Sequence, residues 1–141
     1  MTDILVTIRG TGTNYVMAQR DVIQLHCCSP GLEVAEVQNA PWITTYRDPY
    51  LVAATWVKRC EMAEIDATWY ACWDYYATEV LPRAVEILRV EDFDGPVVKS
   101  HGSTPAREAY LAGDMETYFS IVPERMVNHA LDLTTDLRAA A

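Results

Sequence analysis

The first hydrophobic run of the chain covers residues 4–8 and is almost continuous. Its members are Ile4, Leu5, Val6, Thr7 and Ile8. β-Branched side chains fit a pleated, buried surface, and an apolar run of this length ahead of a glycine is typical of a strand. Because the run is continuous rather than alternating, it predicts a strand covered on both faces, as in a parallel sheet.

Shorter segments complete the predicted sheet. Apolar and polar residues alternate over residues 32–37, which predicts a second strand, and Val97 and Val98 predict a short third one. Residues 42–46 fit either an irregular loop or a short edge strand. Residues 15–25, which follow a glycine-rich turn, are predicted to form a short helix.

The main helical layer is predicted between residues 48 and 88. Asp48 can cap a helix, and Pro49 suits the first helical position because its missing N–H is not needed there. Apolar residues then recur every three or four positions, as on the buried face of a helix. The predicted buried positions are Ala53, Val57, Cys60, Trp69, Cys72 or Trp73, Tyr76 and Val80, continued beyond Pro82 by Ala84, Val85 and Leu88.

Three features predict the C-terminal helices. Gly113 ends a short helix over residues 106–112, Asp114 caps the next turn, and Pro123 opens the last helix. The buried stripe of that last helix is Met126, Ala130, Leu133 and Leu137. Together the elements predict a single α/β domain over residues 1–141, helix-rich, with a small, mostly parallel sheet of about three strands.

The charge balance limits the classes of partner. The chain carries a net charge of −9, from 11 basic and 20 acidic residues. Binding to nucleic acid or to anionic membranes needs a basic surface, so both are disfavoured, and a basic protein partner is favoured. The chain opens without a signal-peptide pattern and has no apolar run near the roughly 18 residues of a membrane span, which predicts a cytoplasmic or virion-associated protein.

The cysteines do not follow a metal-binding pattern. Cys27, Cys28, Cys60 and Cys72 are irregularly spaced, which favours reduced thiols. His26 lies beside the first two, but the paired C-x-x-C of a structural zinc site is absent. The sequence therefore predicts neither a metal nor a cofactor.

Aromatic residues are concentrated between residues 56 and 76. They are Trp56, Trp69, Tyr70, Trp73, Tyr75 and Tyr76. Tyr and Trp are typical interface anchors, so we predict an interface on this helix that binds a protein partner or a second copy. The alternative is a helix enclosed within its own domain.

Two places could carry chemistry. The turn Gly10, Thr11 and Gly12 follows the first strand and could hold an anion or oxyanion on its backbone N–H groups, or it could be a simple strand-to-helix turn. The candidates for a hydrolytic triad are Ser103, Asp114, His101 and His129. The Gly-x-Ser-x-Gly elbow of α/β hydrolases is absent.

Several patches resemble, in order, the cutinase-like α/β hydrolases, especially the lysin B esterases of mycobacteriophages. They are the RGTG turn at residues 9–12, residues 73–82, residues 97–107 and residues 110–118 with Val122 and Pro123. The resemblance implies that the turn at residues 9–12 contributes to an oxyanion site and that Asp114 matches the catalytic aspartate. The chain departs from the family where the serine elbow should precede Trp73 and where a C-terminal histidine should follow.

The resemblance therefore implies a reduced relative that has lost the reaction, since removing a triad member removes most of the catalysis. We expect a non-catalytic protein-binding or structural protein, such as a bacteriophage virion or assembly component. One alternative is a small serine esterase that uses Ser103, Asp114 and His101 or His129. A second is an acidic immunity-type or inhibitor protein that neutralises a basic partner.

Overall fold

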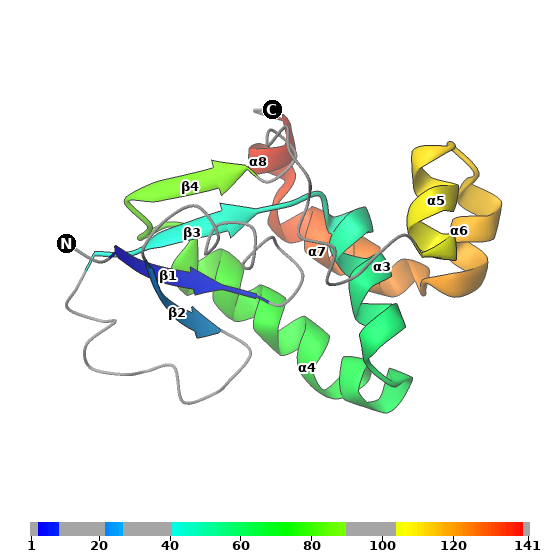
Figure 1. Cartoon of the computed structure of the whole chain (residues 1–141), viewed down its shortest axis with the longest axis horizontal. Helices are drawn as coiled ribbons and strands as arrows, with labels where there is room; N and C mark the ends of the chain where they lie inside the picture. The colour runs from blue at the N-terminus through cyan, green and yellow to red at the C-terminus, as the bar shows by residue number, and fades with distance from the viewer. Residues whose placement is uncertain (1–2, 9–21, 27–40, 90–103, 140–141) are drawn as a thin grey trace.

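The computed structural model describes residues 3–8, 22–26, 41–89 and 104–139. Four strands form one sheet in the order β2-β1-β3-β4, and every pairing is parallel (Figure 1). The strands are β1 (Asp3–Thr7), β2 (Val22–His26), β3 (Ile43–Tyr46) and β4 (Glu86–Arg89). Helices pack beside the sheet, so the prediction of a small, parallel, helix-rich α/β fold is confirmed, with one strand more than the count of about three.

Strand β1 lies inside the sheet and is buried on both faces, as its continuous apolar run predicts. Val6 and Ile8 belong to the large core, whereas Leu5 packs with Ile43 in a second, small cluster. Successive residues of a strand point to opposite faces, so the two clusters lie on opposite faces of the sheet. A fully parallel sheet with two covered faces is the arrangement that such sequences favour.

Two predicted helical segments are strands instead. Residues 22–26 were expected at the end of a helix, but they pair with β1 along its whole length. Residues 86–89 were expected to extend the helix stripe, but they pair with β3. Both segments are short and apolar at several positions, so neighbouring strands decide their conformation more than local periodicity does.

The ambiguous segment at residues 42–46 forms β3, and it lies between β1 and β4 rather than at an edge. All four of its residues are buried. The predicted strands at residues 32–37 and at Val97 and Val98 lie outside the described residues, as does most of the predicted helix at 15–25.

Two long helices connect β3 to β4. Helix α3 (Pro49–Arg59) begins where predicted, with Asp48 as its cap and Pro49 in its first turn. Helix α4 (Met62–Tyr75) continues into a π-helix, η1 (Tyr76–Val80). The Trp42 indole donates to the carbonyl of Val80 at 3.1 Å, which ties the end of η1 to the start of β3.

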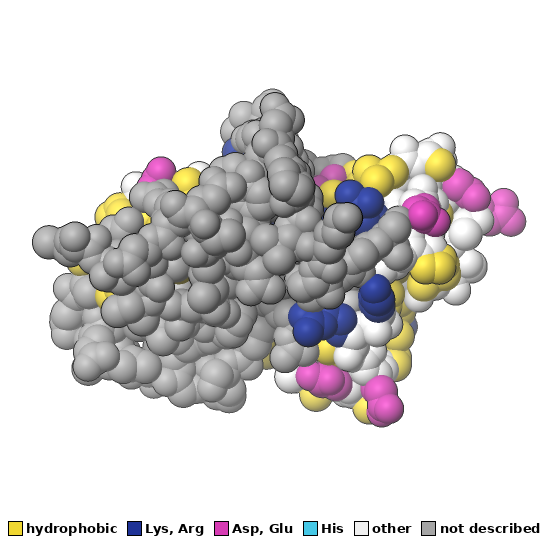
Figure 2. All heavy atoms as spheres, viewed as in Figure 1, with side chains coloured by type: hydrophobic (Ala, Val, Ile, Leu, Met, Phe, Trp, Pro, Cys, Tyr) yellow, Lys and Arg dark blue, Asp and Glu magenta, His cyan; other side chains and the backbone are white. Residues whose placement is uncertain are grey.

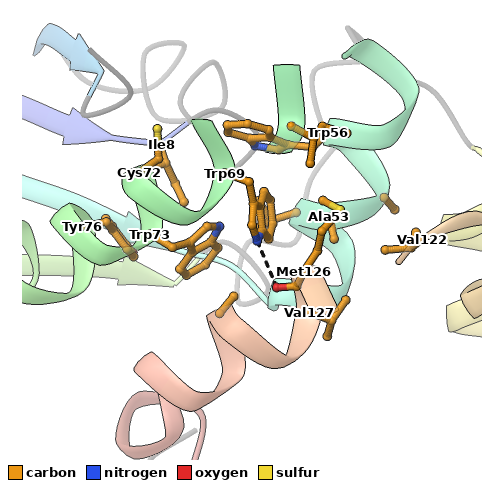
Figure 3. Close-up of a cluster of buried hydrophobic side chains, with 14 of the residues drawn as sticks. Ile8, Ala53, Trp56, Trp69, Cys72, Trp73, Tyr76, Val122, Met126 and Val127 are labelled. Carbon is orange, nitrogen blue, oxygen red and sulfur yellow. Dashed lines mark hydrogen bonds between the residues drawn. The ribbon is translucent and has the colours of Figure 1, made fainter. Parts of the chain in front are cut away.

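The core between these helices is built from tryptophans. Trp56 and Trp69 meet edge to face with their ring centroids 5.1 Å apart, and the ring centroids of Trp69 and Trp73 are 5.5 Å apart (Figure 3). The Trp69 indole donates to the Met126 carbonyl at 3.0 Å, and the Tyr76 hydroxyl donates to the Thr45 carbonyl of β3. These contacts bring α3, α4, the sheet and the C-terminal helices around one centre.

The C-terminal part is helical. Helices α5 (Pro105–Leu111) and α6 (Met115–Ile121) form a hairpin at one end of the molecule, followed by α7 (Glu124–Leu133) and α8 (Thr135–Ala139) (Figure 1). The predicted end at Gly113 and the cap at Asp114 are confirmed, and Gly113 has a φ of +78°. The predicted last helix is interrupted at Thr134, so Leu137 lies in α8. Within the four described ranges, no helix is both long enough and apolar enough to cross a membrane.

Candidate functional site at the carboxyl edge of the sheet

The strand order identifies the edge where a ligand site would be expected. The chain passes from β1 to β2 on one side and later returns to the other side of β1 as β3. In open parallel sheets, ligands bind beyond the carboxyl ends of the two strands whose connections diverge. Here these strands are β1 and β3. The predicted loop at Gly10, Thr11 and Gly12 follows β1 but lies outside the described residues, whereas Asp48 follows β3 and is described.

Asp48 uses both carboxylate oxygens for structural contacts. Oδ1 accepts from the Tyr50 backbone N–H at 3.1 Å, which caps α3. Oδ2 accepts from the Tyr110 hydroxyl of α5. The first turn of α3 would otherwise present free N–H groups to an anion, so the carboxylate of the chain itself occupies the position that an anionic ligand would take.

Aromatic rings surround this carboxylate. Tyr50 stacks on Tyr110, with ring centroids 4.7 Å apart and 11° between the ring planes. Tyr50 also meets Tyr118 and Phe119 edge to face, at centroid distances of 5.6 and 6.3 Å. The Tyr118 hydroxyl donates to the Tyr50 carbonyl at 2.6 Å. We call Asp48, Tyr50, Tyr110, Tyr118 and Phe119 the tyrosine joint, because they attach the α5–α6 hairpin to the start of α3.

The chemistry of the joint favours the neutral phenol. Burial raises the pKa of Tyr118 far above its usual range, and the nearby charge of Asp48 adds to the effect. Tyr118 therefore remains a hydrogen-bond donor at neutral pH. Tyr118 donates to a backbone carbonyl, and both Asp48 oxygens accept within the joint, so these contacts connect α3 to the α5–α6 hairpin.

Asp114, the position matched to a catalytic aspartate, is also a helix cap. Its carboxylate accepts from the Thr117 backbone N–H at 3.2 Å and from the Thr117 hydroxyl at 2.6 Å. These two hydrogen bonds lower the pKa of Asp114. The side chain is thus held to the first turn of α6 and is exposed.

The predicted base His129 pairs with a different carboxylate. Its Nε2 lies 2.7 Å from Oδ1 of Asp74 on α4, and its ring meets Tyr70 edge to face at 5.1 Å. Four residues earlier on α7, Arg125 donates to Asp66 of α4 at 3.0 Å. The hydrogen bond with Asp66, assisted by the nearby Tyr70, raises the pKa of Arg125. These pairs join α4 to α7, and the structure does not join His129 to Asp114; Ser103 and His101 lie outside the described residues.

The aromatic residues predicted as an interface are mostly core. Trp56, Trp69, Trp73 and Tyr76 are at most 1% exposed, so for these four the interface prediction is wrong and the alternative of an enclosed helix holds. Tyr70 and Tyr75 are partly buried at its margin. The four side chains are buried because α7 and α3 pack against α4 and because side chains of β1 belong to the same core.

Metal ligation finds no support in the described ranges. They contain no group of three or more His, Cys, Asp or Glu side chains that could hold an ion. Cys60 and Cys72 are buried, and Cys27 and Cys28 lie outside the described residues.

The sequence analysis missed the tyrosine joint. It identified Asp48 and Asp114 as caps from local signals, but Tyr110 lies 62 residues from Asp48 and Tyr118 lies 68 residues from Tyr50. One signal was available in the sequence. Tyr110 follows Ala106 at a spacing of four, and Tyr118 follows Met115 at a spacing of three, so each tyrosine belongs to an apolar stripe on a short helix. Two such stripes suggest a common buried partner.

Comparisons with models of known protein families, with curated proteins and with solved structures gave no match. The likeness to cutinase-like hydrolases therefore stays a prediction from the sequence. The function has to be argued from the described residues themselves.

Proposed function

We propose that this chain is a non-catalytic protein-binding or structural protein. One observation carries the proposal: the carboxylate at the switch point of the sheet and the carboxylate matched to a catalytic aspartate are both helix caps. A triad carboxylate holds a histidine, whereas the hydrogen bonds described for these two carboxylates come from helix N–H groups, from Tyr110 and from the Thr117 hydroxyl. The resemblance adds the more specific proposal of a bacteriophage virion or assembly component.

An acidic inhibitor or immunity-type protein is a second candidate, and the region of α5 and α6 favours it. Glu108, Asp114, Glu116 and Glu124 are the only ionisable side chains other than tyrosine in residues 108–124, so this stretch has no Lys, Arg or His. A surface with one sign of charge steers a partner of opposite sign and excludes partners of like sign. This is a form of protein binding and needs no catalytic residue.

The proposal is tested against the esterase alternative with p-nitrophenyl acetate and p-nitrophenyl butyrate. We compare wild-type protein, Ser103→Ala and a matched control, Ser120→Ala, whose exposed hydroxyl donates to the Thr117 carbonyl on α6. We expect all three proteins to release nitrophenol at the same background rate. Turnover that Ser103→Ala abolishes and Ser120→Ala keeps would show a serine hydrolase and overturn the proposal.

A further inference from the structure

We infer that the outer face of the α5–α6 hairpin docks a basic, amphipathic segment of a protein partner. The inference rests on the proposed protein-binding function and names its surface. We define the outer face by five exposed residues of the hairpin: Glu108, Leu111, Asp114, Glu116 and Ile121.

The outer face exposes large aliphatic side chains. Leu111 is 59% exposed and Ile121 is 38% exposed. The inner face of the hairpin is already filled by Ala106, Ala109 and Tyr118, which are buried against the rest of the domain. Burying apolar surface is favourable, so a leucine left in water on a well-packed helix is available to a partner.

The exposed charged side chains of the hairpin, Glu108, Asp114 and Glu116, are all acidic. Figure 2 shows Asp and Glu side chains together with hydrophobic ones over α5 and α6, while the Lys and Arg side chains visible in that view lie nearer the middle of the molecule. Glu108 and Leu111 are three residues apart on one face of α5, so an acidic and an apolar group can be contacted together. Arg107 lies one turn before Leu111 on α5, but it is partly buried.

The hairpin is fixed before a partner arrives. The tyrosine joint holds α5 and α6 to α3. Both helices also have side-chain caps: the Thr104 hydroxyl accepts from the Arg107 N–H at 3.1 Å, and the Asp114 carboxylate accepts from the Thr117 N–H. A surface that is already ordered loses less conformational entropy on binding. The face therefore has the rigidity, the apolar anchors and the charge that a docking surface needs.

Charge complementarity decides the kind of partner. A second copy would bring the same carboxylates against themselves, and nucleic acids and anionic lipids would add phosphates of the same sign. A segment that presents Lys or Arg beside an apolar side chain satisfies both the carboxylates and Leu111. A basic amphipathic helix is the simplest segment of that chemistry.

The test uses a fluorescein-labelled peptide of leucine and lysine that folds as an amphipathic helix, with binding measured by fluorescence anisotropy. Leu111→Ser is compared with Val85→Ser, which removes an aliphatic side chain that is 67% exposed at the start of β4. Glu116→Lys is compared with Glu64→Lys, the same reversal at an exposed site on α4. Circular dichroism confirms that each variant is folded.

We expect Leu111→Ser to weaken binding by about tenfold, and Glu116→Lys to weaken it several-fold, with a loss that shrinks in 0.5 M salt. Val85→Ser and Glu64→Lys should stay within about twofold of wild type. If the variant and its control lost the same affinity for the peptide in both pairs, the attraction would be diffuse and the inference would be overturned. Absence of binding, or stronger binding to single-stranded DNA or anionic vesicles, would overturn it too. Because these results do not involve ester turnover, they can fail while the proposed non-catalytic function stands.

Discussion

Two aromatic clusters lie on either side of α3, and they use the same kind of side chain differently. The tryptophan core of Trp56, Trp69 and Trp73 is fully buried, and its contacts are mainly apolar. The tyrosine joint is partly exposed at Tyr50 and Tyr110, and its hydroxyl groups donate to Asp48 and to the Tyr50 carbonyl.

The difference separates the stability of the domain from the placement of one exposed element. Removing a tryptophan takes apolar area from the centre that all the main helices share, so the whole domain should lose stability. Removing a joint contact affects the attachment of the α5–α6 hairpin, so the loss should be smaller and local. Three substitutions test this distinction.

Trp69→Ala should have the largest effect. Trp69 is fully buried between α3, α4 and α7, and its indole donates to Met126. The substitution leaves a large cavity and removes the indole hydrogen bond, so the free energy of unfolding should fall by about 3–5 kcal/mol. Urea unfolding followed by circular dichroism measures the loss.

The control is Tyr75→Ala on the same helix. Tyr75 was predicted as an interface residue together with Trp69, but it is only partly buried. The free energy of unfolding should fall clearly less in Tyr75→Ala than in Trp69→Ala. If the two variants lost the same stability, α4 would not have the enclosed face that the structure gives it.

The sequence predicted most of the elements that depend on local chemistry. The Asp48–Pro49 helix start, the Gly113 stop and the Asp114 cap each follow from a side chain acting on its own backbone neighbours. β1 followed from an almost continuous apolar run. β2 and β4 could not be predicted in the same way, because their conformation comes from pairing with strands distant in the sequence.

The same limit applies to the site. Aromatic residues between 56 and 76 fit a core and an interface equally well in the sequence, since the periodicity of a helix does not show how many of its faces are covered. Burial decides between the two only once α7 is seen packed on α4. The contacts of Tyr110 and Tyr118 with α3 are likewise products of tertiary structure.

Asp48→Ala should have the second largest effect. It removes the cap of α3 and leaves the Tyr110 hydroxyl without its acceptor, so the free energy of unfolding should fall by about 2 kcal/mol. Amide hydrogen exchange should show the additional opening in α5 and α6 rather than in α4.

Asp48→Asn is the matched control, because asparagine caps helices about as well as aspartate. It should keep α3 intact and weaken mainly the contact with Tyr110. If exchange rose equally in α4 and in α5 for the alanine variant, the joint would be part of the main core and the two clusters would not be separable.

Tyr118→Phe should have the smallest effect at neutral pH. It deletes the hydrogen bond to the Tyr50 carbonyl and keeps the ring, so the expected loss is about 1 kcal/mol. The decisive measurement is the pH dependence of that loss, obtained from urea unfolding between pH 7 and pH 11.

The sign follows from the pKa of Tyr118, which is raised in the folded protein by burial. The contribution of this phenol to stability is complete below the unfolded value of about 10 and is lost as the pH rises beyond it, by at most about 1.4 kcal/mol per pH unit. Tyr118→Phe has no proton to lose, so wild type should lose stability faster than the variant above pH 10, and the gap between them should close. A gap that stayed constant up to pH 11 would mean that Tyr118 titrates like a tyrosine in water, and the tyrosine joint would not be closed to solvent around its hydroxyl.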